Sequence, residues 1–455
     1  MAPSLYDVIV IGGGPVGLAA TYEVAKAGKK VLVLEQNNFY NQAGSSPDLV
    51  RMFRTMYTED FMAKLAKKSM GFWNDLERDA GESLRWMSGL LNFGDARMGE
   101  NTPEGTLLGP IDNLKKLNMA YQQLTAQEIQ DRWPFKNLPD EWEGLYAPDN
   151  GVVNVPLLLR SLLRLAKDYG ADAKQHAEVT SIAYDNSSSS WRVDILHRDK
   201  KQASFHAIKI ILASGAYVNH VLQPSFGIHL DLDIWEMTAS YFNTNAGPNG
   251  TIFPSMWFQF APNDERGRSR LFYGFPAVPW GPPNLARIAV DAATRRIKDP
   301  RDRSSSEINA QDIADTQAFV RDHVVGVDAT APVFNSTCLQ TNVFDNMFVL
   351  DYLPKEYLRG GPEKSVAVFT AGWAMKFVPL LGRALADMAL NGGSEFALEA
   401  FAITRTDDSG QGIIRVDDAG EAMQVETSSA RPLAGTQVNG QASGSSRHQR
   451  PRMGH

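Results

Sequence analysis

Short apolar runs and segments with helical composition alternate at the start of the chain. Residues 6–11 and 30–34 are short, mainly apolar runs, which is typical of strands buried in a parallel sheet. The Ala-rich segment at 18–27 between them has the composition of a helix, and Gly28 ends it. The first forty residues therefore predict a β-α-β unit.

A glycine pattern stands at the junction between the first strand and this helix. Residues 12–17 are Gly12, Gly13, Gly14, Pro15, Val16 and Gly17, a G-x-G-x-x-G. In a dinucleotide-binding unit, Gly12 permits the tight turn, Gly14 lets a pyrophosphate approach, and Gly17 lets helix and strand pack closely. The helix N-terminus offers N–H groups to that phosphate. Glu35 ends the second strand, where an acid accepts hydrogen bonds from ribose hydroxyls.

The fingerprint alone fits FAD and NAD equally well. An acid at position 35 disfavours the 2′-phosphate of NADP. The chain contains one good fingerprint, whereas an enzyme that uses both a flavin and a nicotinamide often has two. The sequence therefore favours a single, tightly held flavin.

Further helices and strands are predicted along the rest of the chain. Helical patterns cover residues 59–88, 153–170, 310–325 and 377–391. Strand-like runs cover residues 176–184, 190–197, 204–213, 347–351 and 365–370, and short aromatic runs typical of an antiparallel sheet cover 228–292. The run at 204–213 ends in small residues and is expected to join the sheet of the first unit.

These elements predict an α/β, Rossmann-like FAD-binding domain interleaved with an α+β substrate domain built on a mixed or antiparallel sheet. We assign residues 1–90, 151–225 and 331–407 to the FAD-binding domain, and residues 91–150 and 226–330 to the substrate domain. The remainder, 408–455, is assigned to a tail. From about residue 426 it is rich in Ser, Gly, Gln and Arg, which predicts disorder.

Composition excludes several classes of protein. The 455 residues carry a net charge of −7 with acids and bases interspersed, which argues against nucleic-acid binding and a basic membrane-binding surface. No apolar run is long enough to span a bilayer. The one cysteine excludes an internal disulfide and a cysteine-based metal site. Without a signal peptide or a terminal Ser-Lys-Leu, the chain is expected to be cytoplasmic, and we expect a monomer.

Three further segments carry a family resemblance. They are GSSPDLVRMFRTMY at 44–57, STCLQTN at 336–342 followed by FVLD at 348–351, and TAGWAMKFVPLLGR at 370–383. With the N-terminal fingerprint, these segments resemble the monomeric sarcosine oxidase family of flavoenzymes, which includes pipecolate, N-methyltryptophan and fructosyl amine oxidases. The resemblance covers roughly residues 6–400, and it is greatest to members that act in nikkomycin and fumisoquin biosynthesis.

The resemblance implies how the cofactor is held. Family members bind FAD covalently, through a thioether from a cysteine to the 8α-methyl group of the isoalloxazine ring, and Cys338 occupies that motif. Apart from the resemblance, Cys338 reads as a small buried hydrophobe. Further contacts with FAD are expected from Ser45, Ser46, Gly215 and Gly372.

The resemblance also assigns cations to the substrate and the flavin. A guanidinium makes a bidentate clamp on a carboxylate. We give this role to Arg54 and place Arg51 nearer the flavin, although the two are interchangeable on sequence alone. The Ser and Pro residues before them indicate a loop. Lys376 matches a lysine beside the flavin, whose charge stabilises the reduced ring and assists oxygen reduction. Trp373 matches a pocket tryptophan, or is an ordinary core residue.

The chain departs from sarcosine oxidase on one strand. There, a lysine and a histidine four residues later follow a Tyr-Gly-Phe-Pro strand, and here Arg287 and Asp291 fall at those positions. Arg287 keeps a positive charge for oxygen with a different geometry, and Asp291 is placed to orient a substrate nitrogen. Glu104 matches a pocket glutamate loosely and reads equally well as a surface acid.

The predicted function is FAD-dependent oxidation of the C–N bond of an α-amino or imino acid in secondary metabolism. The substrate is a small-molecule secondary, N-methyl or cyclic amine, molecular oxygen is the acceptor, and the products are an imine and hydrogen peroxide. A flavin-dependent dehydrogenase or monooxygenase, a deglycating fructosyl amine oxidase, and a flavoprotein that binds without catalysis remain as alternatives.

Overall fold

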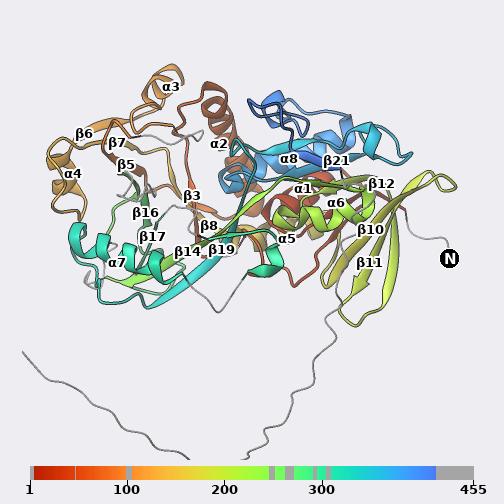
Figure 1. Cartoon of the computed structure of the whole chain (residues 1–455), viewed down its shortest axis with the longest axis horizontal. Coiled ribbons are helices and arrows are strands. Elements are labelled where there is room, and N and C mark those ends of the chain that lie inside the picture. The colour runs from red at the N-terminus through yellow and green to blue at the C-terminus, as the bar shows by residue number, and fades with distance from the viewer. Residues whose placement is uncertain are drawn as a thin grey trace, which may run out of the picture. The chain divides into compact units, whose positions relative to one another are not determined.

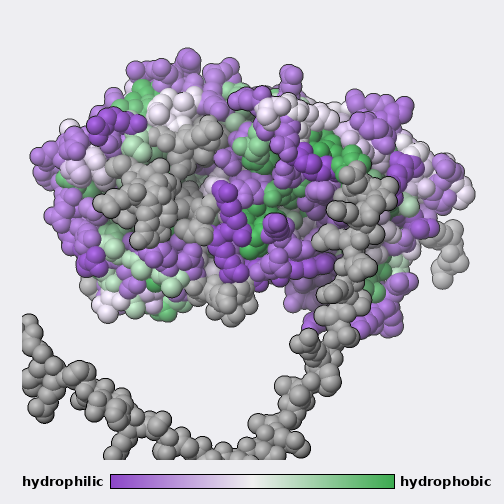
Figure 2. All heavy atoms as spheres, viewed as in Figure 1, coloured by the Kyte–Doolittle hydropathy of each residue, from purple (hydrophilic) through white to green (hydrophobic). Residues whose placement is uncertain are grey.

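The computed structural model describes residues 5–46, 48–98, 105–244, 252–261, 271–290, 295–303 and 309–416 (Figure 1). Within these ranges the strands form an eight-stranded sheet, a nine-stranded sheet and two small sheets. In the view of Figure 2, hydrophilic residues cover most of the described surface, and hydrophobic residues occupy small separate areas. The apolar runs of the sequence are thus mainly buried within the fold.

The eight-stranded sheet is built on the predicted β-α-β unit. The strands β1 (Leu5–Ile11) and β2 (Val31–Leu34) are parallel, and β12 (Gln202–Leu212) pairs with the other side of β1, as predicted for this run. The strand order is β10-β11-β12-β1-β2-β9, with β21 on β12 and β20 on β21. The other strands are β9 (Asp172–Lys174), β10 (Ala177–Asp185), β11 (Ser190–His197), β20 (Val349–Tyr352) and β21 (Val366–Thr370).

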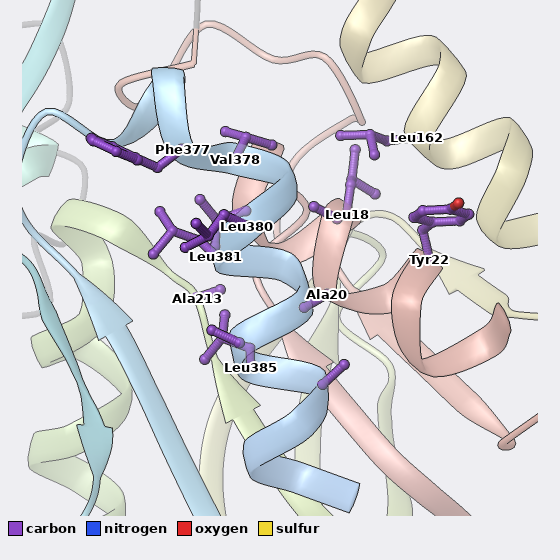
Figure 3. Packing of buried hydrophobic residues seen from close by; sticks show 14 of the residues in the cluster. Leu18, Ala20, Tyr22, Leu162, Ala213, Phe377, Val378, Leu380, Leu381 and Leu385 are labelled. Carbon is purple, nitrogen blue, oxygen red and sulfur yellow. The ribbon is translucent and has the colours of Figure 1, made fainter. Parts of the chain in front are cut away.

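Three helices pack together on one face of this sheet. They are α1 (Pro15–Lys26), α5 (Val155–Asp168) and α8 (Val378–Asn391), and Figure 3 shows their buried side chains in one cluster. A Cβ at Gly382 of α8 would lie 2.5 Å from the Cβ of Ala19 on α1, so only glycine allows this approach. The helix α8, near the end of the described chain, is therefore packed directly against α1.

The nine-stranded sheet is mixed, as predicted. Its order is β18-β14-β17-β16-β15-β5-β7-β6, with β19 also on β14, and β5 and β15 are its parallel pair. The strands are β5 (Leu90–Gly94), β6 (Gln122–Thr125), β7 (Glu143–Ala147), β14 (Asp233–Asn243), β15 (Met256–Phe260), β16 (Phe272–Phe275), β17 (Leu285–Val290), β18 (Arg296–Ile297) and β19 (Phe334–Asn342). The two sheets confirm the predicted fold class, and the domain boundaries stay a prediction.

Individual residues set where several of the helices begin and end. The helix predicted over 59–88 is α2 (Asp60–Ala80), which ends early because Gly81 takes a left-handed φ of 71°. At α5 the side chain of Asn154 accepts from Leu157 N, which sets the start of that helix. The others are α3 (Ile111–Lys116), α4 (Ala126–Arg132), α6 (Val218–Phe226) and α7 (Ala310–His323). No helix in the described ranges is both long and apolar enough to cross a bilayer.

Two small sheets correct the sequence prediction. Arg51 lies on the strand β3 (Val50–Phe53) rather than in a loop, and β3 pairs with β8 (Gly151–Asn154), which also pairs with β4 (Arg85–Trp86). The strand β13 (Ile228–Leu230) does not join the predicted sheet of 228–292, because it pairs with β22 (Ile414–Val416). That pairing places 414–416 in the folded part, although the sequence assigned them to the tail. The predicted disorder from about residue 426 lies outside the described residues.

Candidate functional site

A deep cavity among the described residues gathers segments that are far apart in the sequence. It is lined by the β1–α1 turn, the segment after β2, side chains of β14 to β17 and β19, and the turn before α8. The predicted site residues on its wall are Gly12, Gly14, Val16, Glu35, Ser45, Ser46, Arg51, Arg54, Gly215, Arg287, Cys338, Gly372, Trp373 and Lys376. Gly17 packs behind this wall, and Asp291 and Glu104 lie outside the described residues.

The glycine turn is shaped by close backbone contacts. Gly12 has a φ of 108°, and a Cβ on it would lie 2.4 Å from the carbonyl oxygen of Ala213 at the end of β12. A Cβ on Gly17 would lie 1.9 Å from the carbonyl oxygen of Gly12. Both positions therefore exclude side chains, and the turn brings the start of α1 up to the end of β1. The first turn of α1 contains Pro15 and no acidic residue, so its N-terminus is open to an anion.

Glu35 is held beside this turn at the end of β2. Its carboxylate accepts hydrogen bonds from the backbone N–H of Gly13 at 2.9 Å and of Asn37 at 2.8 Å. Burial raises the pKa of Glu35, and these two hydrogen bonds oppose the rise. An added Cβ at Gly44 or Gly215 would meet no atom within 4 Å, so at these positions a side chain would project into open space. These features fit the diphosphate and ribose of a dinucleotide.

Cys338 lies on β19, directly opposite Met237 of β14, and both residues line the cavity. The residues on either side of Cys338 are fixed to other segments. Leu339 N donates to Gly44 O at 3.2 Å, and Arg303 donates to the hydroxyl of Thr337 at 2.8 Å. The strand that carries the cysteine is therefore anchored against the segment that follows β2.

A strained turn brings Trp373 and Lys376 to the cavity. Ala371 and Gly372 have positive φ angles of 64° and 73°, and Gly372 N donates to Thr341 O at 3.0 Å. Positive φ in a residue other than glycine costs free energy, and such strain often occurs at functional sites. The backbone oxygen of Lys376 accepts from Ser69 Oγ at 3.0 Å and from Trp73 Nε1 at 2.8 Å. These contacts fix the turn against α2.

Arg54 and Lys376 approach the same aromatic ring. The guanidinium carbon of Arg54 lies 5.6 Å from the centre of the Tyr57 ring, and Nζ of Lys376 lies 5.4 Å from it. Arg54 and Lys376 are buried, with 4% and 6% of their surfaces exposed. The ring is attracted to both cations, which line the cavity, and thereby stabilises two like charges near one another. Sequence reasoning singled out both cations and missed Tyr57.

A second group of charges surrounds Asp48, which precedes β3. Its carboxylate accepts from Arg287 Nε at 2.7 Å, and Arg51 Nη1 lies 3.2 Å away. The hydroxyl of Tyr241 also donates to it. Burial opposes ionisation of Asp48, but Arg287, Arg51 and this hydroxyl outweigh it and lower its pKa to about 2. Burial and the neighbouring carboxylate raise the pKa of Tyr241.

Sequence reasoning found Arg287 but not its partners. Asp48 stands 239 positions before Arg287, and no spacing rule connects two residues at such a distance. The one local signal was that Asp48 belongs to the segment 44–57, whose pattern carried the family resemblance. Tyr241 gave no signal, because an aromatic residue on a buried strand is usual.

Comparison with known proteins agrees with this geometry. The family model "FAD dependent oxidoreductase" matches residues 7–388. A Dictyostelium discoideum protein, provisionally named a bifunctional amine oxidase, is 50% identical over 408 residues, which are 88% of this chain and 37% of that protein. Human peroxisomal sarcosine oxidase is 27% identical over 88% of this chain and 96% of its own length.

The solved structure of NikD, described as an unusual amino acid oxidase essential for nikkomycin biosynthesis, is also similar. It has a TM-score of 0.78 and 31% identity, over 88% of this chain and 97% of that one. These matches confirm the resemblance to the sarcosine oxidase family that was predicted from the sequence.

Proposed function

This chain belongs to the FAD dependent oxidoreductase family, and we propose that it oxidises the C–N single bond of an α-amino or imino acid. The CH–NH unit of the substrate loses two electrons and two protons, so that its C–N single bond becomes the C=N bond of an imine. Molecular oxygen takes up these electrons and protons and becomes hydrogen peroxide. One observation carries the proposal. The glycine turn, the cysteine strand and the pair of cations around Tyr57 all line or border the same cavity.

FAD is the cofactor that this cavity would hold. The turn at Gly12 and Gly14 and the start of α1 would hold the diphosphate, and Glu35 would hold the ribose. When bound, the flavin supplies the two-electron chemistry that protein side chains lack. We further propose that Cys338 holds the flavin covalently. Its place on the cavity wall and the anchored strand around it support that assignment.

Arg54 and Lys376 would bind the carboxylate of the substrate. Both are buried in the cavity wall, where an anion is bound more strongly by a cation than in water. The planar guanidinium of Arg54 suits a bidentate contact, and the ammonium of Lys376 acts as a point charge. With the carboxylate held there, the neighbouring C–N bond has a fixed position in the cavity.

The remaining wall favours a cyclic or aromatic substrate. Trp373, Tyr273 and Phe258 line the cavity, and the rings of Phe258 and Tyr273 lie parallel with centres 5.9 Å apart. Flat apolar walls of this kind bind rings better than a single methyl group. The resemblance to members of nikkomycin and fumisoquin biosynthesis supports a place in secondary metabolism.

The test is production of peroxide from a panel of amino acids. We expect the purified yellow protein to form hydrogen peroxide with cyclic or aromatic secondary amino acids, and to form less with sarcosine. The same compounds without a carboxylate should be at least about a hundredfold poorer, because a lost charge-assisted clamp costs roughly 3 kcal/mol. Equal rates with and without the carboxylate would contradict the roles of Arg54 and Lys376.

A further inference from the structure

One wall of the cavity combines aromatic rings with a buried cation. Arg287 on β17 lies beside both Tyr273 and Phe275 of β16, with its guanidinium carbon 5.2 Å and 5.1 Å from the two ring centres. All three residues line the cavity. A cation in an apolar wall would attract any anionic group of a bound molecule. Whether Arg287 attracts such a group depends on whether another residue already balances its charge.

Asp48 balances the charge of Arg287 at close range. The distance from Arg287 Nε to the Asp48 carboxylate is 2.7 Å, and each side chain is 4% exposed. Ser336 Oγ donates to the same carboxylate oxygen at 3.3 Å, and the hydroxyl of Tyr241 donates to the other oxygen. Contacts from β14, β17 and β19 therefore hold the carboxylate in one position.

The second arginine near Asp48 shares the carboxylate, since Arg51 Nη1 lies 3.2 Å from the oxygen that accepts from Arg287, but it is also held by other groups. Arg51 donates to Val50 O at 2.9 Å and to Ser45 O at 3.2 Å, so its guanidinium is attached to its own segment. Ser46, next to Ser45, lies against the glycine turn, because a Cβ on Gly14 would be 3.3 Å from Ser46 Oγ. Asp48 therefore lies between Arg51, which also contacts the cofactor end of the cavity, and Arg287 in the aromatic wall, and Arg287 is the closer of the two cations.

We propose that Asp48 is a specificity-determining positioning residue, which keeps Arg287 paired so that the aromatic wall receives an uncharged part of the substrate. This inference rests on the proposed function, in which Arg54 and Lys376 take the one carboxylate. The substrate class that follows is a monocarboxylic amine with a neutral ring. In a substrate with a second carboxylate on that ring, this carboxylate would face Arg287, whose charge Asp48 already balances.

The test compares two ligands of the same ring on the flavin-loaded protein, benzoate with one carboxylate and isophthalate with two. Titration calorimetry gives both dissociation constants and does not depend on turnover. For the wild type we expect isophthalate to bind at least about tenfold more weakly than benzoate. In Asp48→Asn the ratio should shift by about tenfold towards isophthalate, the equivalent of one charge-assisted hydrogen bond.

Two further variants keep the test decisive if Asp48→Asn folds poorly. Arg287→Gln leaves the carboxylate without its closest cation, so isophthalate should bind still more weakly relative to benzoate. The double variant Asp48→Asn/Arg287→Gln has no charge on either side chain, and its ratio should return towards the wild-type value. The ratio of the benzoate and isophthalate dissociation constants does not depend on the fraction of protein that is folded. If Asp48 only stabilised the fold, its substitution would therefore leave this ratio unchanged.

The proposal is overturned if the wild type binds isophthalate as tightly as benzoate, or if the ratio is the same in all variants. Its failure can be told apart from failure of the proposed function. A protein that forms peroxide but shows one constant ratio would lose only this inference. A protein whose ratio shifts as expected but which forms no peroxide would lose only the oxidase function.

Discussion

Two parts of the cavity wall, the cofactor end and the aromatic wall, are built in different ways. At the cofactor end, the shape comes from backbone: Gly12 and Gly17 leave no room for a Cβ, and the start of α1 presents N–H groups. At the aromatic wall, the shape comes from side chains, since Asp48, Tyr241 and Arg287 hold one another from three separate segments.

This difference determines which changes each end tolerates. A backbone cradle fails when atoms are added, because carbonyl groups packed at van der Waals distance cannot move apart without moving a strand. A buried charge network fails when a charge is lost, because the remaining partner is left desolvated and unpaired. Added volume should therefore damage the cofactor end, and neutralisation should damage the aromatic wall.

Gly17→Ala should have the largest effect. The new Cβ would lie 1.9 Å from the carbonyl oxygen of Gly12, so α1 and β1 have to separate. We expect purified protein with almost no flavin and a much lower melting temperature, measured by absorbance and by calorimetry. Gly71→Ala on α2 is the matched control, because its Cβ would meet no atom within 4 Å. That variant should gain up to about 1 kcal/mol.

Cys338→Ala should remove the covalent bond to the flavin and leave the fold intact. One thioether is local chemistry, and the anchors at Thr337 and Leu339 do not involve the thiol. Acid precipitation should release all flavin from the variant and none from the wild type. Yellow colour that stays with the precipitated variant would disprove the attachment at Cys338.

Most of the cofactor end could be predicted from the sequence, because its information is local. The run 6–11, the glycines and Glu35 fall within forty residues, and period and spacing define their geometry. The return of β12 to β1 was also predictable, since an apolar strand that ends in small residues fits a buried parallel position. Local signals failed where a left-handed Gly81 ended α2 before its pattern did.

The aromatic wall could be predicted only in part. The resemblance identified Arg287, but its pairing with Asp48 depends on how β17 and the segment before β3 meet in space. Likewise, the pairing of β13 with β22 joins two short runs that carry no mutual signal. Patterns along a sequence report the conformation of neighbours, whereas the partner of a buried charge is set by the tertiary fold.

Lys376→Met should slow reoxidation of the flavin by oxygen by roughly 10²–10³-fold, because a positioned charge near a developing anion contributes a few kcal/mol. The substitution keeps the aliphatic length, so packing beneath the turn should persist. Stopped-flow mixing of the photoreduced variant with oxygen isolates this step from substrate binding. Lys64→Met is the control, since its side chain is 63% exposed on α2.

Reoxidation within about twofold of the wild type would exclude this role for Lys376, since no interaction of the transition state would have been removed. Arg287 would then become the leading candidate for the cation that assists oxygen reduction. Its pairing with Asp48 makes that role testable in the double variant Asp48→Asn/Arg287→Gln.

The smallest predicted effect is the acid sensitivity of the aromatic wall. The pKa of Asp48 is lowered from 3.8 to about 2 in the folded protein, so its contribution to stability is fully present above pH 4 and is lost as the pH falls towards 2. By linkage this contribution is about 2 kcal/mol. The double variant Asp48→Asn/Arg287→Gln lacks it, and its free energy of unfolding in urea should fall less between pH 5 and pH 2 than that of the wild type.

Salt separates this effect from that of an ion pair whose arginine is exposed to solvent. Asp95 also has a pKa lowered to about 2, because the side chain and backbone N–H of Arg97 donate to it, but Arg97 is 82% exposed. At about 1 M salt the Debye length is roughly 3 Å, so the ion pair of Asp95 is screened, while the buried pair of Asp48 is screened much less. The acid-dependent difference between the wild type and the double variant should therefore persist at 1 M salt. If salt abolished it, the pair of Asp48 and Arg287 would have to be solvated rather than buried in the cavity wall.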